Sequence, residues 1–528
     1  MTTQKFNLVT DPWIKVIENQ SYDEKLVSLR TLFEHAQDYR QLAGEIPTQD
    51  LAVLRMLLAI LETVYDDDER MEISRWQDMY RAGHFTDSVQ QYLQDHADSF
   101  DFFGEHPFCQ VTEDEFNSLV PANKKIHGAE GPGQVGVKQI NRTISESGHT
   151  PDIFSPKSDQ FKNDVSFDEL ARWIITYQNI SGANDKTKVK TDGSPASGWL
   201  YRLYPLYIQG DNLFETLMLN LVLSPEAKQK PVWEYGSVTD YVDRLEKLTP
   251  PDNLAELYTN WSRLLHIDWS TGKPIIFSAK LPTFETVDIP LEPMTIWKQD
   301  DDGNVTPAVA GTSTLAQPMW TKYNQIVDPT DDKVREPGVI KWLRSLYQHG
   351  GIPAEKVITL KTADLVFDRS KASNMSSQMP EGEHIDDFSI QAGVLFDEKW
   401  QSMIGSLVST TLQVVMAYGQ FISGLGRVRY AGDVPTTKTF AKNKTDIFYK
   451  TIDKPFTKWL ESLSKTDDLA IKEHEWKEIL RRYAEEALQD MEQASSLRDQ
   501  RGFEQDGKAI NIYTLANGLR YKLKRELQ

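Results

Sequence analysis

Apolar positions divide the chain into a mixed first part and a helical last part. From about residue 396 onward they recur every three or four residues, which is the period of one helix face. Linkers with prolines and charges separate four such amphipathic stripes, which is the pattern of helices in a bundle. The stripes contain Trp400, Met403, Ile404, Leu407, Val408, Val415 and Met416; Phe456, Trp459, Leu460 and Leu463; Trp476, Ile479, Leu480, Tyr483, Ala487 and Met491; and Leu515, Leu519 and Leu523. They predict a C-terminal four-helix bundle.

Helical and extended runs alternate through the earlier residues. Apolar residues at helical spacing between residues 51 and 61 predict a buried helix, which Thr48 can cap. Residues 167–178 and 213–223 predict two more helices, and residues 199–208 predict a strand. We therefore expect an α+β protein. A large mixed α/β domain over residues 1–390 precedes a helical bundle over residues 391–528.

The first residues carry a distinctive extended pattern. Phe6 to Val16 predict a short strand, a corner at Asp11-Pro12 and a second strand that begins near Trp13. Proline removes a backbone donor and pushes the preceding residue out of the helical region, so the corner follows from Pro12. By itself, this pattern indicates a strand pair that ties the chain end into a sheet.

Three polar segments interrupt the predicted elements. Residues 121–166 hold five glycines and several lysines, residues 181–198 are rich in lysine, and residues 370–387 form a polar insert. Long irregular loops in compact proteins are either functional or disordered. Small polar side chains and amides can enter a nucleic-acid groove, although an ordinary solvated loop has the same composition. Residues 131–138 do not form a phosphate-binding loop, because no serine or threonine follows Lys138.

The charge balance limits how this chain could contact nucleic acid. The net charge is −20 at pH 7, whereas general phosphate binding favours an excess of lysine and arginine. Any such contact is therefore expected to be local, on basic loops of an acidic body, and the acidity could equally serve solubility alone. No apolar run reaches the ~20 residues of a membrane span, and no signal peptide is recognised, so we expect a cytoplasmic protein without membrane contact.

No set of residues has the spacing of a catalytic motif. The single cysteine, Cys109, allows no disulfide and no thiolate zinc site, and is expected to act as a small apolar residue. The ten histidines are scattered. Asp386 and Asp387 could hold a metal, although hydrated loop carboxylates are far commoner. We therefore expect that the protein is not an enzyme and that it binds no cofactor or metal. A magnesium-dependent nuclease that uses these two aspartates is the enzymatic alternative.

Several motifs occur in a characteristic order. The run Phe6–Val16, the element His106-Pro107-Phe108, the helix ending at Tyr177-Gln178 and the C-terminal bundle follow one another along nearly the whole chain. In this order the sequence resembles the CasA family, the large subunit of the type I-E CRISPR Cascade complex.

The resemblance implies a noncatalytic subunit of an RNA-guided DNA surveillance complex. Such a subunit recognises the protospacer-adjacent motif in double-stranded DNA, promotes duplex opening and R-loop formation, and helps to recruit a helicase-nuclease. Its implied partners are CasB, CasC, CasD, CasE, the 5′ handle of the CRISPR RNA and the target DNA. The alternative is a structural scaffold subunit of a ribonucleoprotein, without direct motif readout.

The resemblance also implies which loops read DNA. The family uses a glycine-containing loop, a lysine finger and a glutamine-bearing wedge, and a further loop contacts the guide-RNA handle or neighbouring subunits. The implied DNA-reading residues are Gly182, Asn184, Lys186, Lys188, Lys280, Asn374, Ser376, Ser377 and Gln378, and the implied handle or subunit contacts are Phe154, Lys157 and Lys162. The glycine loop departs from the family in having one glycine followed by lysines, so phosphate contacts by lysine would replace close backbone approach.

Overall fold

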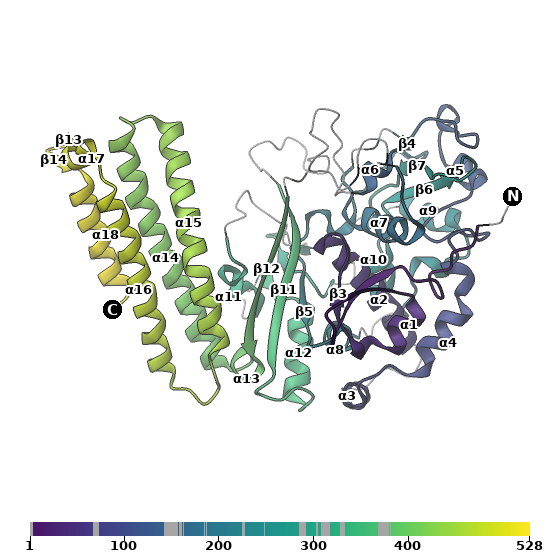
Figure 1. The fold of residues 1–528 in the computed structure, drawn as a ribbon, viewed down its shortest axis with the longest axis horizontal. Coiled ribbons are helices and arrows are strands. Elements are labelled where there is room, and N and C mark those ends of the chain that lie inside the picture. Colours follow the sequence, from purple (N-terminus) through teal and green to yellow (C-terminus); the bar gives the residue numbers. More distant parts are fainter. Residues whose placement is uncertain are drawn as a thin grey trace. The chain divides into compact units, whose positions relative to one another are not determined.

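A computed structural model gives the fold of this chain (Figure 1). It describes residues 4–66, 73–141, 157, 161, 163–183, 185, 187–223, 228–247, 249–284, 292–302, 305–307, 317–327, 333–367, 380 and 382–528, without the side chains of 138, 139 and 202. Helices and short sheets mix in the earlier residues, and long helices fill the last part, which confirms the predicted α+β class. Within the described ranges, no helix combines the length and apolar character needed to cross a membrane.

Contacts within the chain divide it into two compact units. The larger unit comprises Met1–Ser313, Pro337–Leu343 and Lys361–Ile385, and the smaller unit comprises Thr314–Glu336, Arg344–Leu360 and Asp386–Gln528. Because compactness does not establish independent folding, the predicted domain boundary at residue 390 stays a prediction.

The opening segment forms one strand of the predicted pair. Strand β1, Ile14–Glu18, lies between β2, Glu24–Val27, and β3, Tyr39–Leu42, in an antiparallel sheet. The first predicted strand is wrong. The backbone N–H of Asn7 donates to Asp11 Oδ2 at 2.7 Å, and the Val9 N–H donates to Asn7 Oδ1 at 2.9 Å. These local side-chain bonds close a turn and take donors that a strand ladder would use.

The centre of the larger unit is the buried helix α2, Pro47–Asp66. The helix begins at Pro47, so the prediction that Thr48 caps it is wrong. Proline suits the first helical position, where its missing donor has no intrahelical partner to lose. Helix α2 packs against α7, Phe167–Ile180, and α10, Leu254–Thr259. Helix α7 confirms the helix predicted over residues 167–178.

A second antiparallel sheet lies in the same unit. Its order is β4, Gln134–Val135, then β7, Ile275–Lys280, then β6, Arg263–Asp268. The β6–β7 register pairs Arg263 with Lys280. Buried apolar residues on one face of this sheet, including Leu264, Phe277 and Ala279, belong to a hydrophobic core cluster that also contains Val189.

Two predicted extended segments differ from the structure. Residues 199–202 form a 3-10 helix and only β5, Leu206–Gln209, is a strand, because Tyr201 N–H donates to Gly198 O and closes a turn. The polar insert predicted over residues 370–387 is shorter than expected. Strand β12, Gly382–Gln391, already includes its last residues and joins β11, Val357–Val366, and β5 in one sheet.

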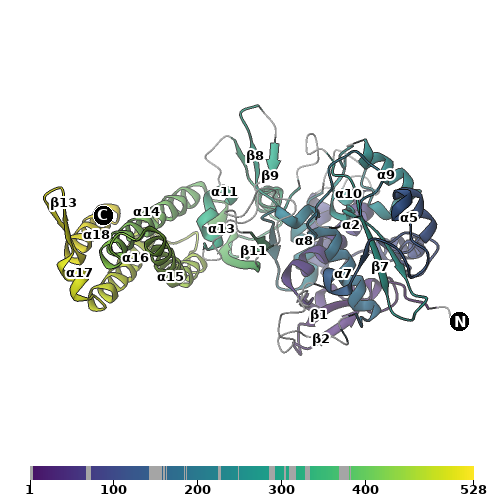
Figure 2. The ribbon, with the colours of Figure 1, turned by 90° about the horizontal axis from the view of Figure 1, so that it is seen from above.

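The C-terminal bundle is confirmed. Helices α14, Glu398–Arg429, α15, Val434–Glu461, α16, Leu469–Gln493, and α18, Ile512–Glu526, pack together as Figures 1 and 2 show. Met416 is an exception to its predicted apolar stripe, because its side chain is 60% exposed.

The remaining helices and strands are short. They are α1 Leu29–Glu34, α3 Ile73–Ala82, α4 Asp87–Asp95, α5 Glu113–Leu119, α6 Val137–Ile140, α8 Leu213–Asn220, α9 Val238–Glu246, α11 Tyr323–Val327, α12 Gly338–Gln348, α13 Ala392–Leu395, α17 Leu497–Arg501, β8 Trp297–Gln299, β9 Val305–Pro307, β10 Val334–Arg335, β13 Phe503–Gln505 and β14 Lys508–Ile510. Helix α8 confirms the helix predicted over residues 213–223.

The bundle core depends on Trp476. Its indole N–H donates to Thr411 Oγ1 at 2.9 Å, and its ring centre lies 4.8 Å from that of Phe456. We expect Trp476→Ala to destabilise the bundle by about 3–5 kcal/mol, because truncating a buried aromatic residue leaves a cavity. Ile471→Ala, on the exposed face of the same helix, should cost at most about 0.5 kcal/mol. Denaturant unfolding followed by helical circular dichroism measures both; equal losses would contradict this packing.

A partly buried ion-pair network attaches the opening segment to α7. Arg172 donates to Glu45 Oε1 at 2.7 Å and to the Trp13 carbonyl at 2.5 Å, and Lys15 lies 2.9 Å from the same Glu45 oxygen. Burial alone would raise the pKa of Glu45, but the hydrogen bonds and charges of Arg172 and Lys15 outweigh it and lower this pKa to about 2.

The lowered pKa of Glu45 predicts an acid-sensitive contribution to stability. Because the folded-state pKa of about 2 lies below the unfolded value of 4.5, the contribution is fully present above pH 4.5 and is lost as the pH falls toward 2. Glu45→Gln should therefore lower the melting temperature at pH 7, and the difference from wild type should shrink between pH 4.5 and 2. Thermal unfolding across this range tests it, with the exposed Glu24→Gln as control. A difference that is constant with pH would contradict the assignment.

Candidate nucleic-acid interface

Two of the predicted DNA-reading segments lie side by side at the C-terminal end of β7, the central strand of the second sheet. Lys188 forms an isolated parallel bridge with Lys280, the last residue of β7. The backbone N–H of Val189 donates to Lys280 O at 3.1 Å, and the Lys280 N–H donates to Thr187 O at 2.9 Å. The candidate glycine loop and the candidate lysine finger are thus joined by main-chain hydrogen bonds.

The segment 187–190 presents its lysines to solvent. Thr187 and Val189 are buried and Lys188 and Lys190 are exposed, which is the alternation of an extended chain on a core. The Lys188 ammonium donates to Thr191 O at 3.0 Å, and the Lys190 ammonium donates to Ser118 O at 2.8 Å. An ammonium has three donors, so each lysine keeps the capacity to bind a phosphate oxygen.

Lys280 is less exposed to solvent than Lys188 and Lys190. Its side chain is half-buried, and this burial lowers the pKa of its ammonium. The carboxylate of Asp185 opposes that effect, while the positive charges of Arg263 and Lys188 lower the pKa further. A nearby phosphate would therefore favour the charged form of Lys280 and relieve the repulsion among these cations.

Gly182 has a packing role in this arrangement. It is buried, and a Cβ atom at this position would lie 2.5 Å from the hydroxyl oxygen of Tyr201. Its carbonyl oxygen accepts a hydrogen bond from Arg263. Gly182 is thus buried by protein in the free chain, and its contact with DNA stays a prediction.

A glycine-bearing segment beside the same strand was not expected at this site. Gly133 has φ +90°, a Cβ atom placed on it would lie 2.8 Å from Thr187 Oγ1, and its carbonyl accepts from the Ser278 N–H at 3.0 Å. The sequence shows these glycines, but residues 131–138 lack the pattern of a phosphate-binding loop, and nothing in the sequence indicated this contact. Gly133 lets the backbone approach the segment that carries Lys188.

Comparison with known proteins identifies the family. A family model described as CRISPR-associated protein Cse1 matches residues 7–487. The chain belongs to the Cse1 family. A curated CasA/Cse1 protein from Thermus thermophilus is 25% identical over 234 residues, which cover 44% of this chain and 42% of that relative. The alignment thus spans less than half of the relative's length. The resemblance to the CasA family is confirmed.

Solved Cse1 structures share the fold over the full chain. Thermobifida fusca Cse1 gives a TM-score of 0.77 at 20% identity, covering 100% of this chain and 99% of that chain. Cse1 from Acidimicrobium ferrooxidans gives a TM-score of 0.73 at 18% identity, with 100% and 98% coverage. A chain from a CRISPR RNA-guided surveillance complex gives a TM-score of 0.58 at 13% identity, with 98% and 99% coverage.

Lys157 has an internal partner in this Cse1-family chain. Its ammonium donates to both carboxylate oxygens of Glu169 at 2.8 Å and to Asp164 O at 2.6 Å. These bonds engage its three donors within the chain, and the contact of Lys157 with the guide-RNA handle or a neighbouring subunit stays a prediction. The other predicted site residues lie outside the described ranges: Phe154, Lys162, Asn184, Lys186, Asn374, Ser376, Ser377 and Gln378.

The aspartate pair of the nuclease alternative lies on a strand of the Cse1 fold. Asp386 and Asp387 belong to β12, so their expected place in a hydrated loop is wrong. Asp386 Oδ2 accepts from the backbone N–H of Met319 at 2.5 Å. Across the described part of the chain, no group of three or more histidine, cysteine, aspartate or glutamate residues could hold a metal ion.

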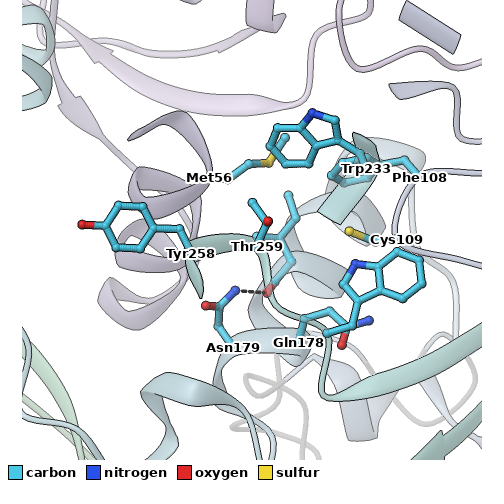
Figure 3. A pocket seen from close by; sticks show the side chains of 10 residues that line it. Met56, Phe108, Cys109, Gln178, Asn179, Trp233, Tyr258 and Thr259 are labelled. Atoms are coloured by element: carbon cyan, nitrogen blue, oxygen red, sulfur yellow. Dashed lines mark hydrogen bonds between the residues drawn. The ribbon is translucent and has the colours of Figure 1, made fainter. Parts of the chain in front are cut away.

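Cys109 lines two small cavities of this Cse1-family chain. The smaller one, of about 30 Å³, is shown in Figure 3 with Phe108, Trp233 and Tyr258 around it. A second cavity, of about 150 Å³, shares Phe108, Cys109, Trp233 and Trp261 with it. The smaller volume suits about one or two water molecules rather than a substrate. Burial raises the pKa of Cys109 to about 12, so the thiol is protonated at neutral pH and is a poor nucleophile.

The destabilisation caused by crowding at Gly133 can be measured separately from the destabilisation caused by its positive φ. Gly133→Ala should destabilise the chain in two ways. The positive φ costs about 1–2 kcal/mol, and crowding of the new Cβ atom against Thr187 adds about 1–3 kcal/mol. Gly128 has φ +54°, and a Cβ atom at this position would have nothing within 4 Å, so Gly128→Ala should show the strain alone. Chemical unfolding of the two variants tests this difference. Equal destabilisation would refute the packing role of Gly133.

Proposed function

We propose that this Cse1-family chain is a noncatalytic subunit of a CRISPR RNA-guided DNA surveillance complex. In this proposal it recognises the protospacer-adjacent motif in double-stranded DNA, promotes duplex opening and R-loop formation, and helps to recruit the helicase-nuclease. The observation that carries the proposal is the main-chain pairing of the Lys188 segment with Lys280. Two segments far apart in the sequence, each implied by the family resemblance to read DNA, meet at the end of β7.

The charge distribution supports local rather than general DNA binding. The chain carries a net charge of −20, whereas this site presents Lys188, Lys190 and the half-buried Lys280. Phosphates are attracted to the three ammonium groups and repelled by the acidic remainder. Such a subunit holds arbitrary DNA weakly and binds where its lysines fit a groove.

Motif reading and duplex opening are assigned to different residues. The minor groove mainly distinguishes A·T from G·C pairs and reports groove width, which suits a lysine finger such as Lys280. The proposed wedge of Asn374, Ser376, Ser377 and Gln378 would separate the first base pairs, at a cost of a few kcal/mol per step. Guide–target pairing then replaces the DNA duplex in a nearly balanced exchange, so a small local contribution is enough to start it.

The proposed partners follow from the family. They are the CasB, CasC, CasD and CasE subunits, the 5′ handle of the CRISPR RNA, the target DNA and the recruited helicase-nuclease, in the cytoplasm. Phe154, Lys157 and Lys162 are the proposed contacts to the handle or to a neighbouring subunit. Gly182, Asn184 and Lys186 are proposed DNA contacts beside Lys188.

Lys280→Ala and Gln378→Ala test the proposal in the reconstituted complex. We expect each variant to weaken motif-dependent DNA binding about tenfold. Lys280→Ala removes a hydrogen bond to a charged group, which contributes about 1.5–3 kcal/mol, and Gln378→Ala removes a wedge side chain that offsets the cost of opening the duplex. Lys280→Ala should also reduce the salt dependence of binding by about one phosphate contact. Electrophoretic mobility shifts at several salt concentrations measure both effects.

The matched control is Lys298→Ala, which removes an exposed lysine from β8. It should leave motif-dependent binding unchanged. Assembly is checked by co-purification with the guide RNA and the other subunits. If Lys280→Ala and Gln378→Ala disturb assembly but leave motif discrimination intact, the chain is a scaffold subunit without direct readout.

A further inference from the structure

One buried arginine contacts both ends of the segment that carries the exposed lysines. Arg263 has 0% exposure and lies directly opposite Lys280 in the β6–β7 register. One terminal nitrogen donates to Gly182 O, and the other donates to Ala196 O at 2.9 Å. Its Nε donates to Asp185 Oδ2. A single guanidinium thus contacts the segment near its start and near its end.

The neighbours of Arg263 leave this side chain little freedom. Gln178 Oε1 accepts from the backbone N–H groups of Ser262 and Arg263, both at 2.9 Å, and Gln178 Nε2 donates to Arg263 O at 2.9 Å. The Tyr177 hydroxyl donates to Asp185 Oδ1 at 2.9 Å, and the guanidinium lies 5.7 Å from the Tyr177 ring centre. Helix α7 therefore fixes both the arginine backbone and its carboxylate partner.

The contacts of Arg263 set the register of the segment on the sheet. Besides the hydrogen bonds of residues 187–189 with Lys280, the Ala196 N–H donates to Leu281 O at 2.8 Å. The arginine contacts lie at Gly182, Asp185 and Ala196, so they flank the part that pairs with β7. Only a planar guanidinium directs several donors in fixed directions, and a lysine ammonium at the same place could not reach all of these acceptors.

We infer that Arg263 is a positioning residue that holds Gly182, Asp185, residues 187–189 and Ala196 in register with the end of β7 and so preorganises the DNA-reading site. This inference rests on the proposed function. Arg263 itself is buried and contacts no DNA. It acts through the placement of Lys188 and Lys280, since a site held in its binding geometry pays less ordering entropy when the ligand arrives.

The test compares Arg263→Lys with Arg55→Lys. Arg55 also has 0% exposure and lies in the same unit, but it pairs with Glu292 and donates to Leu257 O, away from the 182–196 segment. Both substitutions keep the charge and remove a buried guanidinium. Asp185→Asn is a milder variant at a half-buried residue, which keeps the test usable if Arg263→Lys does not fold.

The first measurement is hydrogen exchange of the full chain without DNA. We expect Arg263→Lys to speed exchange at least tenfold in peptides covering residues 182–198 and 276–281, with Asp185→Asn smaller in the same direction. Arg55→Lys should leave these peptides unchanged relative to the rest of the unit. Wild-type exchange in Arg263→Lys, or a uniform increase like that of Arg55→Lys, would overturn the inference.

The second measurement is motif-dependent DNA binding by the assembled complex. Arg263→Lys should weaken it about tenfold while Arg55→Lys leaves it unchanged. If Arg263→Lys loosens the segment but keeps wild-type affinity while Lys280→Ala loses it, the inference is wrong and the proposed function stands. If Lys280→Ala also keeps wild-type affinity, the proposed function fails, and the exchange data alone then support or overturn the structural role of Arg263.

Discussion

The arrangement around Lys280 depends on the burial of one positive charge. Removing a guanidinium from water costs free energy that is recovered only when its donors find acceptors with good geometry. Arg263 obtains these acceptors from Asp185, from its neighbour Ser262 and from the carbonyls of Gly182 and Ala196. The segment therefore has to lie where those oxygens surround the guanidinium. The same requirement places Lys188 beside Lys280.

This constraint explains why the glycines of the region matter without touching a ligand. A side chain at Gly182 would meet the Tyr201 hydroxyl, and a side chain at Gly133 would meet Thr187. Either contact would push the segment off the sheet and away from Arg263. Both glycines thus allow close approach of main chain to protein, whereas the glycines of a phosphate loop allow close approach to a ligand.

The electrostatic design follows from the same geometry. The buried cation of Arg263 and the half-buried cation of Lys280 repel each other. The carboxylate of Asp185 supplies the compensating negative charge. An anion beside Lys280 would relieve this repulsion, while the net charge of −20 disfavours general contact with phosphates. Under the proposed function, the chain would therefore bind DNA only where its lysines fit.

The spacing of apolar residues in the sequence was enough to predict the longer amphipathic helices. The four bundle helices, α7 and α8 were all predictable, because an amphipathic stripe of adequate length has one favourable way to bury its apolar face. The order of motifs was enough to indicate the CasA family. Short elements were harder to predict. Residues 8–10 form a turn instead of a strand, because the side chains of Asn7 and Asp11 accept hydrogen bonds from nearby backbone, and strand propensity does not include this competition.

Only the tertiary structure decided which candidate residues form one surface. Lys188 and Lys280 were both candidates, but their adjacency arises from hydrogen bonds between segments remote in the sequence. Lys157 and Gly182 had the expected residue types, yet one is neutralised by Glu169 and the other is covered by Tyr201. Arg263 carried no sequence signal as an organising residue, because its importance lies in acceptors contributed by other segments. The sequence by itself determined the amphipathic helices and the family. The fold decided which charged groups are buried, because their partners lie far away in the sequence.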